Sequence, residues 1–293
     1  MHSYLRAIGF SKLKKKNDID KIIKMVINNP IYKKSAKNPD GEEIYELRKE
    51  FGDKLGISIR GEYNDNNEFE PYYYYPYFDG HCITTEEIVE IEKHSEKESY
   101  AGVCDDVKVG VSIIFYLQNI IDYFEIKAKH NSSRLNVKTT ISALSISGKV
   151  LLPIIKNPVQ IENTRKSTLN RNHLISAARQ GDEEAIESLT LEDIDTYTMI
   201  SKKILHEDVY SLVDTMFMPY GIESDQYLVI GEIMDVKLVE NRLTGEEIYE
   251  MHLICSDLEF DICINKEDLL GEPAIGRRFK GVVWIQGKIN LND

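Results

Sequence analysis

Hydrophobic and polar positions alternate most regularly from Asp225 onward. Alternation of this kind is typical of strands that bury one face. The residues expected to face inward are Met234, Val236, Leu238, Tyr249, Met251, Leu253, Cys255, Leu258, Phe260, Ile262 and Ile264. Those expected to face outward include Glu250, His252, Glu259, Asp261 and Cys263. Residues with turn propensity separate the runs, and a last run extends from Phe279 to Ile289. The pattern predicts a C-terminal OB-like β-barrel domain over residues 222–293.

The N-terminal part of the chain mixes helix and strand patterns. We expect a strand over residues 3–13, and then a helix from Asp18 through Asn28 with an apolar stripe. The segment 31–41 is polar and is predicted to be a loop. Three antiparallel strands are predicted at 43–51, 57–63 and 69–78, because turn residues separate them. The fold class is therefore α+β, with an N-terminal domain over residues 1–156 that contains a mainly antiparallel sheet.

The second half of that domain is less clearly patterned. An acidic helix is expected at 86–94. The apolar stretch 111–126 fits either a buried helix or a long strand, and its periodicity does not decide between them. Residues 135–153 are predicted to form a strand pair that turns near Gly148.

The middle of the chain, residues 157–221, is predicted to be a linker followed by a helical segment. The linker covers 157–172, and the first helix begins near Arg171 and ends at Gly181. Asp182 is expected to cap the next helix. Further helices are expected from Thr190 through 205 and from 206 to 218.

Composition and cysteine usage indicate a soluble cytoplasmic protein. The chain has 293 residues, of which 42% are hydrophobic and 29% charged, and this fits two or three globular domains. No apolar run reaches the length of a transmembrane helix, and the N-terminus does not resemble a signal peptide. The four cysteines form no CxxC pair, so reduced thiols are expected.

Charge excludes some classes of partner. The net charge of −13 opposes binding to nucleic acid or to an anionic membrane. Residues 222–293 carry 15 acidic and seven basic residues, although an oligonucleotide-binding barrel needs a positive groove. The distribution is uneven, since residues 1–37 carry ten basic and two acidic residues. We therefore expect neither nucleic-acid nor membrane binding; the oligomeric state stays open.

Aromatic residues are the candidate binding surface. Tyr73, Tyr75 and Tyr77 alternate between Pro71 and Phe78, and Trp284 is the one tryptophan of the chain. Exposed aromatic side chains of this kind can bind a sugar, a base or a peptide. The alternative is structural: the tyrosines pack inward, and Trp284 packs where two domains meet.

No catalytic or metal-binding motif stands out. His81, Cys82, His94 and Cys104 match no zinc spacing, so no metal and no cofactor are expected. The serines between 142 and 147 lie in no nucleophile elbow, so no catalytic residue is predicted.

Four segments resemble an uncharacterised clostridial (Firmicutes) family, a domain of unknown function. They are MHSYLRAIGFS, AARQGDEEAIESLTLEDIDTY, FMPYGIESDQYLVIGEI and GVVWIQGKI. The resemblance covers nearly the full chain and implies a cytosolic bacterial protein. It implies no activity, so no site residue is carried over.

Three hypotheses about function follow. The first is a non-catalytic binding or adaptor protein with a protein partner. The second is an enzyme whose cleft lies between the N-terminal domain and the helices. The third is a single-stranded nucleic-acid binder that uses the barrel.

Overall fold

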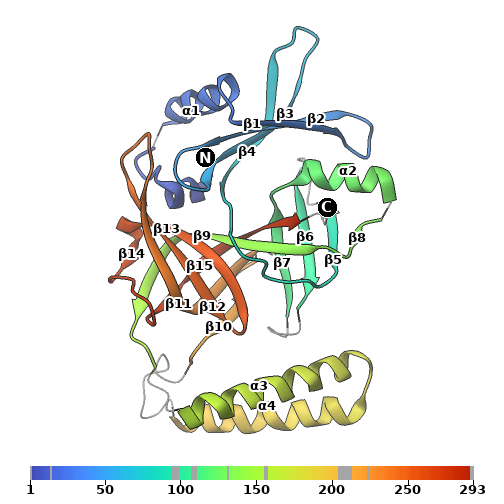
Figure 1. Cartoon of the computed structure of the whole chain (residues 1–293), viewed down its shortest axis with the longest axis vertical. Coiled ribbons are helices and arrows are strands. Elements are labelled where there is room, and N and C mark those ends of the chain that lie inside the picture. The colour runs from blue at the N-terminus through green and yellow to red at the C-terminus, as the bar shows by residue number, and fades with distance from the viewer. Residues whose placement is uncertain are drawn as a thin grey trace.

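The computed structural model describes residues 2–13, 15–93, 99–106, 111–130, 132–154, 158–203, 213–222 and 225–290. A four-stranded antiparallel sheet lies at one end of the molecule, a barrel and its sheet extension lie in the middle, and a helical hairpin lies at the other end (Figure 1). The fold is mixed α+β, as the hydrophobic pattern predicted.

Five strands form a closed barrel. In the order in which they pair around it, they are β11 (Gln226–Glu240), β12 (Glu247–Cys255), β13 (Leu258–Asn265), β9 (Lys138–Leu151) and β15 (Arg278–Asn290). The pair β13–β9 is parallel, and the other four pairs are antiparallel. The pairing of β11 with β15 closes the ring, so neither strand is left as a free edge along this stretch.

The predicted inward face is confirmed for the hairpin β12–β13, but it was wrong for Met234, which lies at a bulge of β11, and for Leu238, because both are exposed. Leu258, Phe260, Ile262 and Ile264 are fully buried in the barrel core. The fifth strand, β9, comes from the range that we assigned to the N-terminal domain. Barrel closure therefore requires a strand from outside residues 222–293, and the division of the chain at 156 and 222 stays a prediction.

The barrel continues into a wider sheet because the end of β15 also pairs with β7 in parallel. Beyond β15 the strands follow in the order β7 (Ser112–Leu117), β6 (Tyr100–Asp105), β5 (Val89–Lys93) and β8 (Arg134–Leu135). The short strands β10 (Met216–Pro219) and β14 (Leu269–Leu270) pair with β11 and β9, and η2 (Lys266–Asp268) links β13 to β14.

The four-stranded sheet has the order β1-β2-β3-β4 and is antiparallel throughout. Its strands are β1 (Tyr32–Lys37), β2 (Glu43–Glu50), β3 (Leu55–Tyr63) and β4 (Phe69–Phe78). The three strands expected at 43–51, 57–63 and 69–78 are thus confirmed, and β4 lies at the edge, where its prolines are tolerated. The helix α1 (Lys16–Asn28) packs on this sheet through Ile19, Ile22 and Val26.

Two expectations for the N-terminal part were wrong. Residues 3–13 form no strand: Ser3–Ile8 is the 3-10 helix η1. Its buried residues are Tyr4, Leu5, Ala7 and Ile8, a spacing of three that suits a 3-10 helix and not the period of two of a strand. The segment 31–41 is not a loop, because it contains β1, which pairs along its whole length with β2.

Between residues 86 and 153 the structure corrects two expectations and resolves one that was open. The expected helix at 86–94 is the strand β5, in which Val89 and Ile91 are buried between more exposed glutamates. The ambiguous stretch 111–126 contains both elements, β7 and then α2 (Ile120–His130). The expected strand pair at 135–153 is mainly one strand, β9, since Gly148 lies inside it and leaves room for the Phe279 ring.

The helical segment is a hairpin of α3 (Pro158–Arg179) and α4 (Glu183–Lys203). The linker expected at 157–172 was wrong, because α3 begins at Pro158. A separate helix from Thr190 was also wrong, because α4 runs through it. Gly181 has a left-handed backbone and Asp182 Oδ1 accepts a hydrogen bond from the Ala185 amide at 3.1 Å, so the predicted turn is confirmed. Of the helix expected at 206–218, residues 206–212 lie outside the described residues, and Met216–Pro219 is the strand β10.

All four cysteines are free. Cys255 is buried in the barrel core, and Cys263 faces the other side of β13, as the strand parity predicted. Cys263 is nevertheless fully buried, because η1 and its neighbours cover that part of the barrel's outer face.

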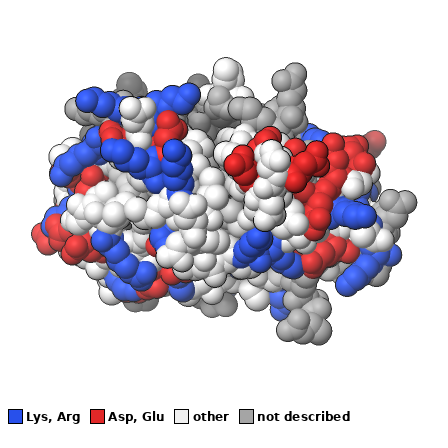
Figure 2. Space-filling view, turned by 90° about the horizontal axis from the view of Figure 1, so that it is seen from above, with Lys and Arg blue, Asp and Glu red and all other residues white. Residues whose placement is uncertain are grey.

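Basic side chains gather on one part of the surface. Exposed lysines lie around α1, namely Lys12, Lys15, Lys16, Lys21 and Lys24. Figure 2, which views the molecule from above, shows basic side chains mainly in its left half and an acidic cluster in its right half, with some side chains of the other sign in each half. Within the described part of the chain, no helix combines the length and the apolar character needed to cross a membrane.

Candidate functional site

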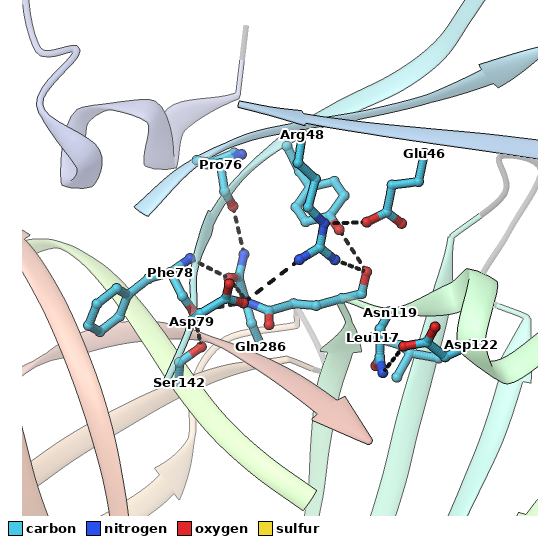
Figure 3. Close-up of polar contacts among 12 residues, drawn as sticks. Glu46, Arg48, Pro76, Phe78, Asp79, Leu117, Asn119, Asp122, Ser142 and Gln286 are labelled. Carbon is cyan, nitrogen blue, oxygen red and sulfur yellow. Dashed lines mark hydrogen bonds and ion pairs between the residues drawn. The ribbon is translucent and has the colours of Figure 1, made fainter. Parts of the chain in front are cut away.

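The segment that follows β4 carries the chain from the four-stranded sheet onto the barrel. The carbonyl oxygen of Phe78 accepts hydrogen bonds from Ser142 Oγ of β9 at 2.5 Å and from Gln118 Nε2 at 2.9 Å. Gln286 of β15 bonds to the same segment, since its Nε2 donates to the Pro76 carbonyl at 2.8 Å (Figure 3). The end of β4 is therefore fixed to the barrel.

A buried arginine cluster holds the two sheets together above this segment. Arg48 and Arg60 both bond to the carboxylate of Glu46, with Arg60 Nε at 3.2 Å. Arg48 Nη2 and Arg60 Nη2 donate to the Gln118 carbonyl at 2.8 and 2.9 Å, beyond the end of β7. Figure 3 shows Arg48 between Glu46 and Asp79. Each buried charge has hydrogen-bond partners, so the cluster serves as a structural connection.

The expected binding residues of β4 lie on the inner face of the sheet. Tyr75 is fully buried; its hydroxyl donates to the Gln118 carbonyl at 2.9 Å. Tyr77 is 2% exposed, and its ring lies 5.1 Å from the Arg48 guanidinium carbon. Tyr73 is partly buried, and burial raises the pKa of its hydroxyl to about 12. Tyr75 and Tyr77 are therefore shielded from solvent, and Tyr73 is partly exposed.

Trp284, the fourth expected residue, is 5% exposed. Its Nε1 donates to Asp225 Oδ2 at 2.7 Å, and its ring lies 5.3 Å from that of Tyr116. Tyr116 in turn lies 4.7 Å from Tyr75, which stacks on Tyr73. The structure thus brings Tyr73, Tyr75 and Trp284 into one buried aromatic cluster, with Tyr77 apart from it. Ligand binding by these four residues stays a prediction.

An open groove lies where the segment after β4 meets the hairpin β12–β13. Gly80 makes the approach possible: a Cβ there would come within 2.9 Å of both the Ile141 carbonyl oxygen and Thr140 Cγ2. Because the chain can lie so close to β9, the His81 amide reaches β13 and donates to Asp261 Oδ2 at 2.7 Å.

Asp261 is the centre of the groove. Nδ1 of His81 lies 2.6 Å from its Oδ2, and Nδ1 of His252 lies 2.9 Å from its Oδ1. His252 is directly opposite Asp261 in the register of β12 and β13, which explains their contact. The side chains of Asp261, His252 and His81 are 7%, 15% and 53% exposed, so the carboxylate is buried and the outer imidazole is open to solvent.

We call the cavity around these residues the His–Asp groove. It has a volume of about 200 Å³ and is lined by Asp53, Lys54, Phe78, Asp79, His81, Asp235, Lys237, Glu250, Met251, His252 and Asp261. Burial raises the pKa of Glu250 to about 7, and its Oε1 is buried without a hydrogen-bond partner among the described residues. Lys237 forms an ion pair with Asp53. The groove therefore contains more acidic than available basic groups.

Two imidazoles on one carboxylate can act in two ways. The imidazoles can supply nitrogen ligands, and the carboxylate an oxygen ligand, to a metal ion. They can also orient a histidine as a proton acceptor, because a carboxylate bonded to one ring nitrogen fixes the tautomer and leaves the other nitrogen free.

The sequence contained only part of the signal for this groove. Strand parity placed Glu250, His252, Glu259 and Asp261 together on the outer face, and this is confirmed. His81 is 180 positions from Asp261, so no spacing motif links them. The other residues that were tested with His81 for a zinc spacing do not join the groove. Cys82 lies beside Glu259, Cys104 is buried in β6, and His94 lies outside the described residues.

Comparison with protein families matches the chain to the model described as "Domain of unknown function, E. rectale Gene description (DUF3881)", over residues 5–287. The chain belongs to the DUF3881 family. The predicted resemblance to a clostridial domain of unknown function is thereby confirmed. Neither the curated proteins nor the solved structures give a significant match to the chain.

The DUF3881 match spans both sheets and the barrel up to Gly287, so it includes every residue of the His–Asp groove. It also spans β9, which comes before β11 in the chain and lies between β13 and β15 in the barrel. The groove thus lies within the region that defines the family.

Proposed function

We propose that the protein is a non-catalytic binding protein that takes a small cationic ligand in the His–Asp groove. The observation that carries this proposal is the buried carboxylate of Asp261, which two imidazoles approach and which meets solvent through the groove. The His81 amide already donates a hydrogen bond to this carboxylate, and a bound cation would add the positive charge that stabilises a buried carboxylate further.

The charge of the groove supports a cationic ligand. Its lining holds five acidic residues, Asp53, Asp79, Asp235, Glu250 and Asp261, and two lysines. One of the lysines, Lys237, is engaged by Asp53. A concave surface with an excess of one charge concentrates ligands of the opposite charge, so cations are attracted and phosphates repelled.

The barrel topology supports a ligand site at this place. The strand order is that of an OB barrel in which the last strand, β9, precedes the first in sequence. On this assignment β12 and β13 are the second and third strands, whose outer face is the usual binding face of OB barrels. His252 and Asp261 lie on that face.

An enzyme remains the second candidate because of one observation. His81 is half exposed, and its Nδ1 contacts a buried carboxylate, which is the arrangement of a general base oriented by an acid. The catalytic groups would then lie in the His–Asp groove and not between the N-terminal domain and the helices.

The cellular setting is also part of the proposal. We infer a bacterial cytoplasmic protein with a protein partner; the four free cysteines support a reducing compartment. The separation of basic and acidic side chains on one face supports association with another protein surface (Figure 2).

Ligand-dependent thermal stability tests the proposed function. The full chain is melted with spermidine, with divalent metal ions, and with phosphate or a short oligonucleotide. We expect one cation to raise the melting temperature of the wild type but not of Asp261→Asn. The matched control is Asp257→Asn, an identical change at the exposed β12–β13 turn, where Asn tolerates the left-handed backbone. Stabilisation by the anions alone, or equal effects of the cation on both variants, would contradict the proposal.

A further inference from the structure

We propose that the cation is a divalent transition-metal ion, bound by His81, His252 and Asp261. The inference rests on the proposed function and names its ligand class. These three side chains form a group in which one ligand atom of each lies within 4.8 Å of the other two.

The distances suit one metal ion. Nδ1 of His81 and Nδ1 of His252 lie 2.6 and 2.9 Å from the oxygens of Asp261. Two ligand atoms in tetrahedral geometry, each about 2.1 Å from a zinc ion, are separated by about 3.4 Å. Both histidine rings must therefore rotate slightly away from Asp261 for the three groups to bind a common ion, and the half-exposed His81 ring has the space to do so. Binding releases any proton on Nδ1 of either ring to solvent, because a metal-bound nitrogen must be deprotonated.

The fold prepares the three ligands in advance. His252 and Asp261 are fixed as a cross-strand pair of the barrel. His81 is held by the hydrogen bond that its backbone amide donates to Asp261 Oδ2 and by the close approach that Gly80 allows. Ligands held on rigid elements lose little conformational entropy when the ion binds.

A carboxylate beside the three residues can accept a hydrogen bond from a metal-binding histidine, as in known metal sites. Nε2 of His252 lies 3.7 Å from the carboxylate of Glu259. If Nδ1 binds the ion, Nε2 carries the proton and faces this carboxylate, and such partners orient metal-bound histidines in known sites. Glu250 adds a buried oxygen without a hydrogen-bond partner among the described residues of the same groove.

The ligand set determines which metal is preferred. Imidazole nitrogens suit zinc, copper, iron and nickel, whereas magnesium and calcium prefer oxygen ligands. Three protein ligands leave further coordination positions open toward the groove, so water or a small molecule can complete the coordination. We expect zinc to bind and millimolar magnesium or calcium not to displace it.

The test uses the full chain without an affinity tag, treated with a chelator and titrated with zinc by calorimetry. We expect one zinc per chain with a dissociation constant at or below about 1 μM. His81→Gln, His252→Gln and Asp261→Asn are each expected to weaken binding at least about tenfold, a typical minimum for loss of a site group. The matched control, His173→Gln, changes an exposed histidine on α3 and should bind as the wild type does.

A second measurement guards against variants that fail to fold. Cobalt added to the wild type should gain the visible absorption of an ion with imidazole ligands, and zinc should abolish it. A spectrum unchanged from cobalt in buffer would overturn the proposal, as would zinc binding that all three variants retain. If spermidine stabilises the protein and no metal binds, the metal inference is wrong and the proposed function stands. If no cation binds, both are wrong.

Discussion

At the scale of single residues, His2 lies in an environment that disfavours a charge. Its ring lies 4.7 Å from that of Trp284, and its Nδ1 is buried without a hydrogen-bond partner among the described residues. Burial, with a smaller effect of the N-terminal charge, lowers the pKa of His2 from 6.5 to about 4. The folded protein therefore holds this imidazole neutral under conditions in which the unfolded chain protonates it.

We expect His2 to make the protein less stable in mild acid. Between the unfolded pKa of 6.5 and the folded pKa of about 4, the unfolded state binds the proton and the folded state does not, so stability falls as pH falls. At about 1.4 kcal/mol per pKa unit, the loss between about pH 7.5 and about pH 4.5 is about 2–3 kcal/mol.

Urea unfolding at these two pH values measures the effect. The decrease in the free energy of unfolding from the higher to the lower pH should be smaller by about this amount in His2→Leu. It should be the same as in the wild type in His173→Gln, whose side chain is exposed. Equal declines in His2→Leu and the wild type would show that His2 is not the group responsible.

The arginine cluster gives a second prediction at this scale. Glu46→Gln removes the carboxylate that bonds to both Arg48 and Arg60, and it leaves two buried guanidinium groups with less compensation. We expect a loss of about 3–5 kcal/mol of unfolding free energy, the usual cost of removing one partner of a buried ion pair. Glu43→Gln on the same strand changes an exposed side chain and should stay within about 0.5 kcal/mol of the wild type. Chemical denaturation of the three proteins compares them; similar midpoints would refute the structural role of the cluster.

At the scale of elements, the sequence predicted strands where one face is buried and the other solvated. The hairpin β12–β13 is the clear case, because its inward residues alternate without interruption. Prediction was wrong where a glycine had a packing role: Gly148 signals a turn, yet it lies within β9 against Phe279. It was also wrong for η1, where the buried residues follow the spacing of three of a 3-10 helix and not the period of two of a strand.

The barrel provides the prediction at the element scale. A fragment of residues 213–290 lacks β9, so β13 and β15 each lose a neighbour and the ring opens. Exposed strand edges pair with other chains. We expect this fragment to melt without cooperativity or to associate. The same fragment with residues 138–151 joined to it through a flexible Gly/Ser linker should be monomeric and melt cooperatively, as circular dichroism and gel filtration can show. A cooperative melt of the shorter fragment would support residues 222–293 as an independent domain.

At the scale of the whole molecule, the candidate site depends on long-range contacts. Parity predicted that His252 and Asp261 share the outer face of the barrel, but only the tertiary fold brings His81 to them. The same fold covers much of the remaining outer face, so that Cys263 and Trp284, both on outward positions, are buried. Periodicity identifies the face of a strand, and it does not reveal which other element covers that face.

The charge of the barrel and the burial of Trp284 lead to the last prediction. We expect no appreciable binding of single-stranded DNA or RNA. Residues 222–293 hold 15 acidic and seven basic residues. Of the basic residues near one turn, Arg278 is buried and donates to the Leu152 and Val213 carbonyls, and Arg277 donates to the Glu272 carbonyl. Trp284 is buried against Tyr116, so no base can stack on it.

Fluorescence polarisation with a labelled oligonucleotide, at about 150 mM salt, measures this binding. We expect a dissociation constant weaker than about 100 μM, the weak limit of non-specific association. Any residual binding should come from the lysines around α1, and should therefore decrease steeply with salt and be insensitive to Trp284→Phe. Saturable binding tighter than about 1 μM would require at least about 8 kcal/mol of interaction free energy. The acidic β12–β13 face does not offer it, so that result would mean that the buried face around Trp284 opens to admit the strand.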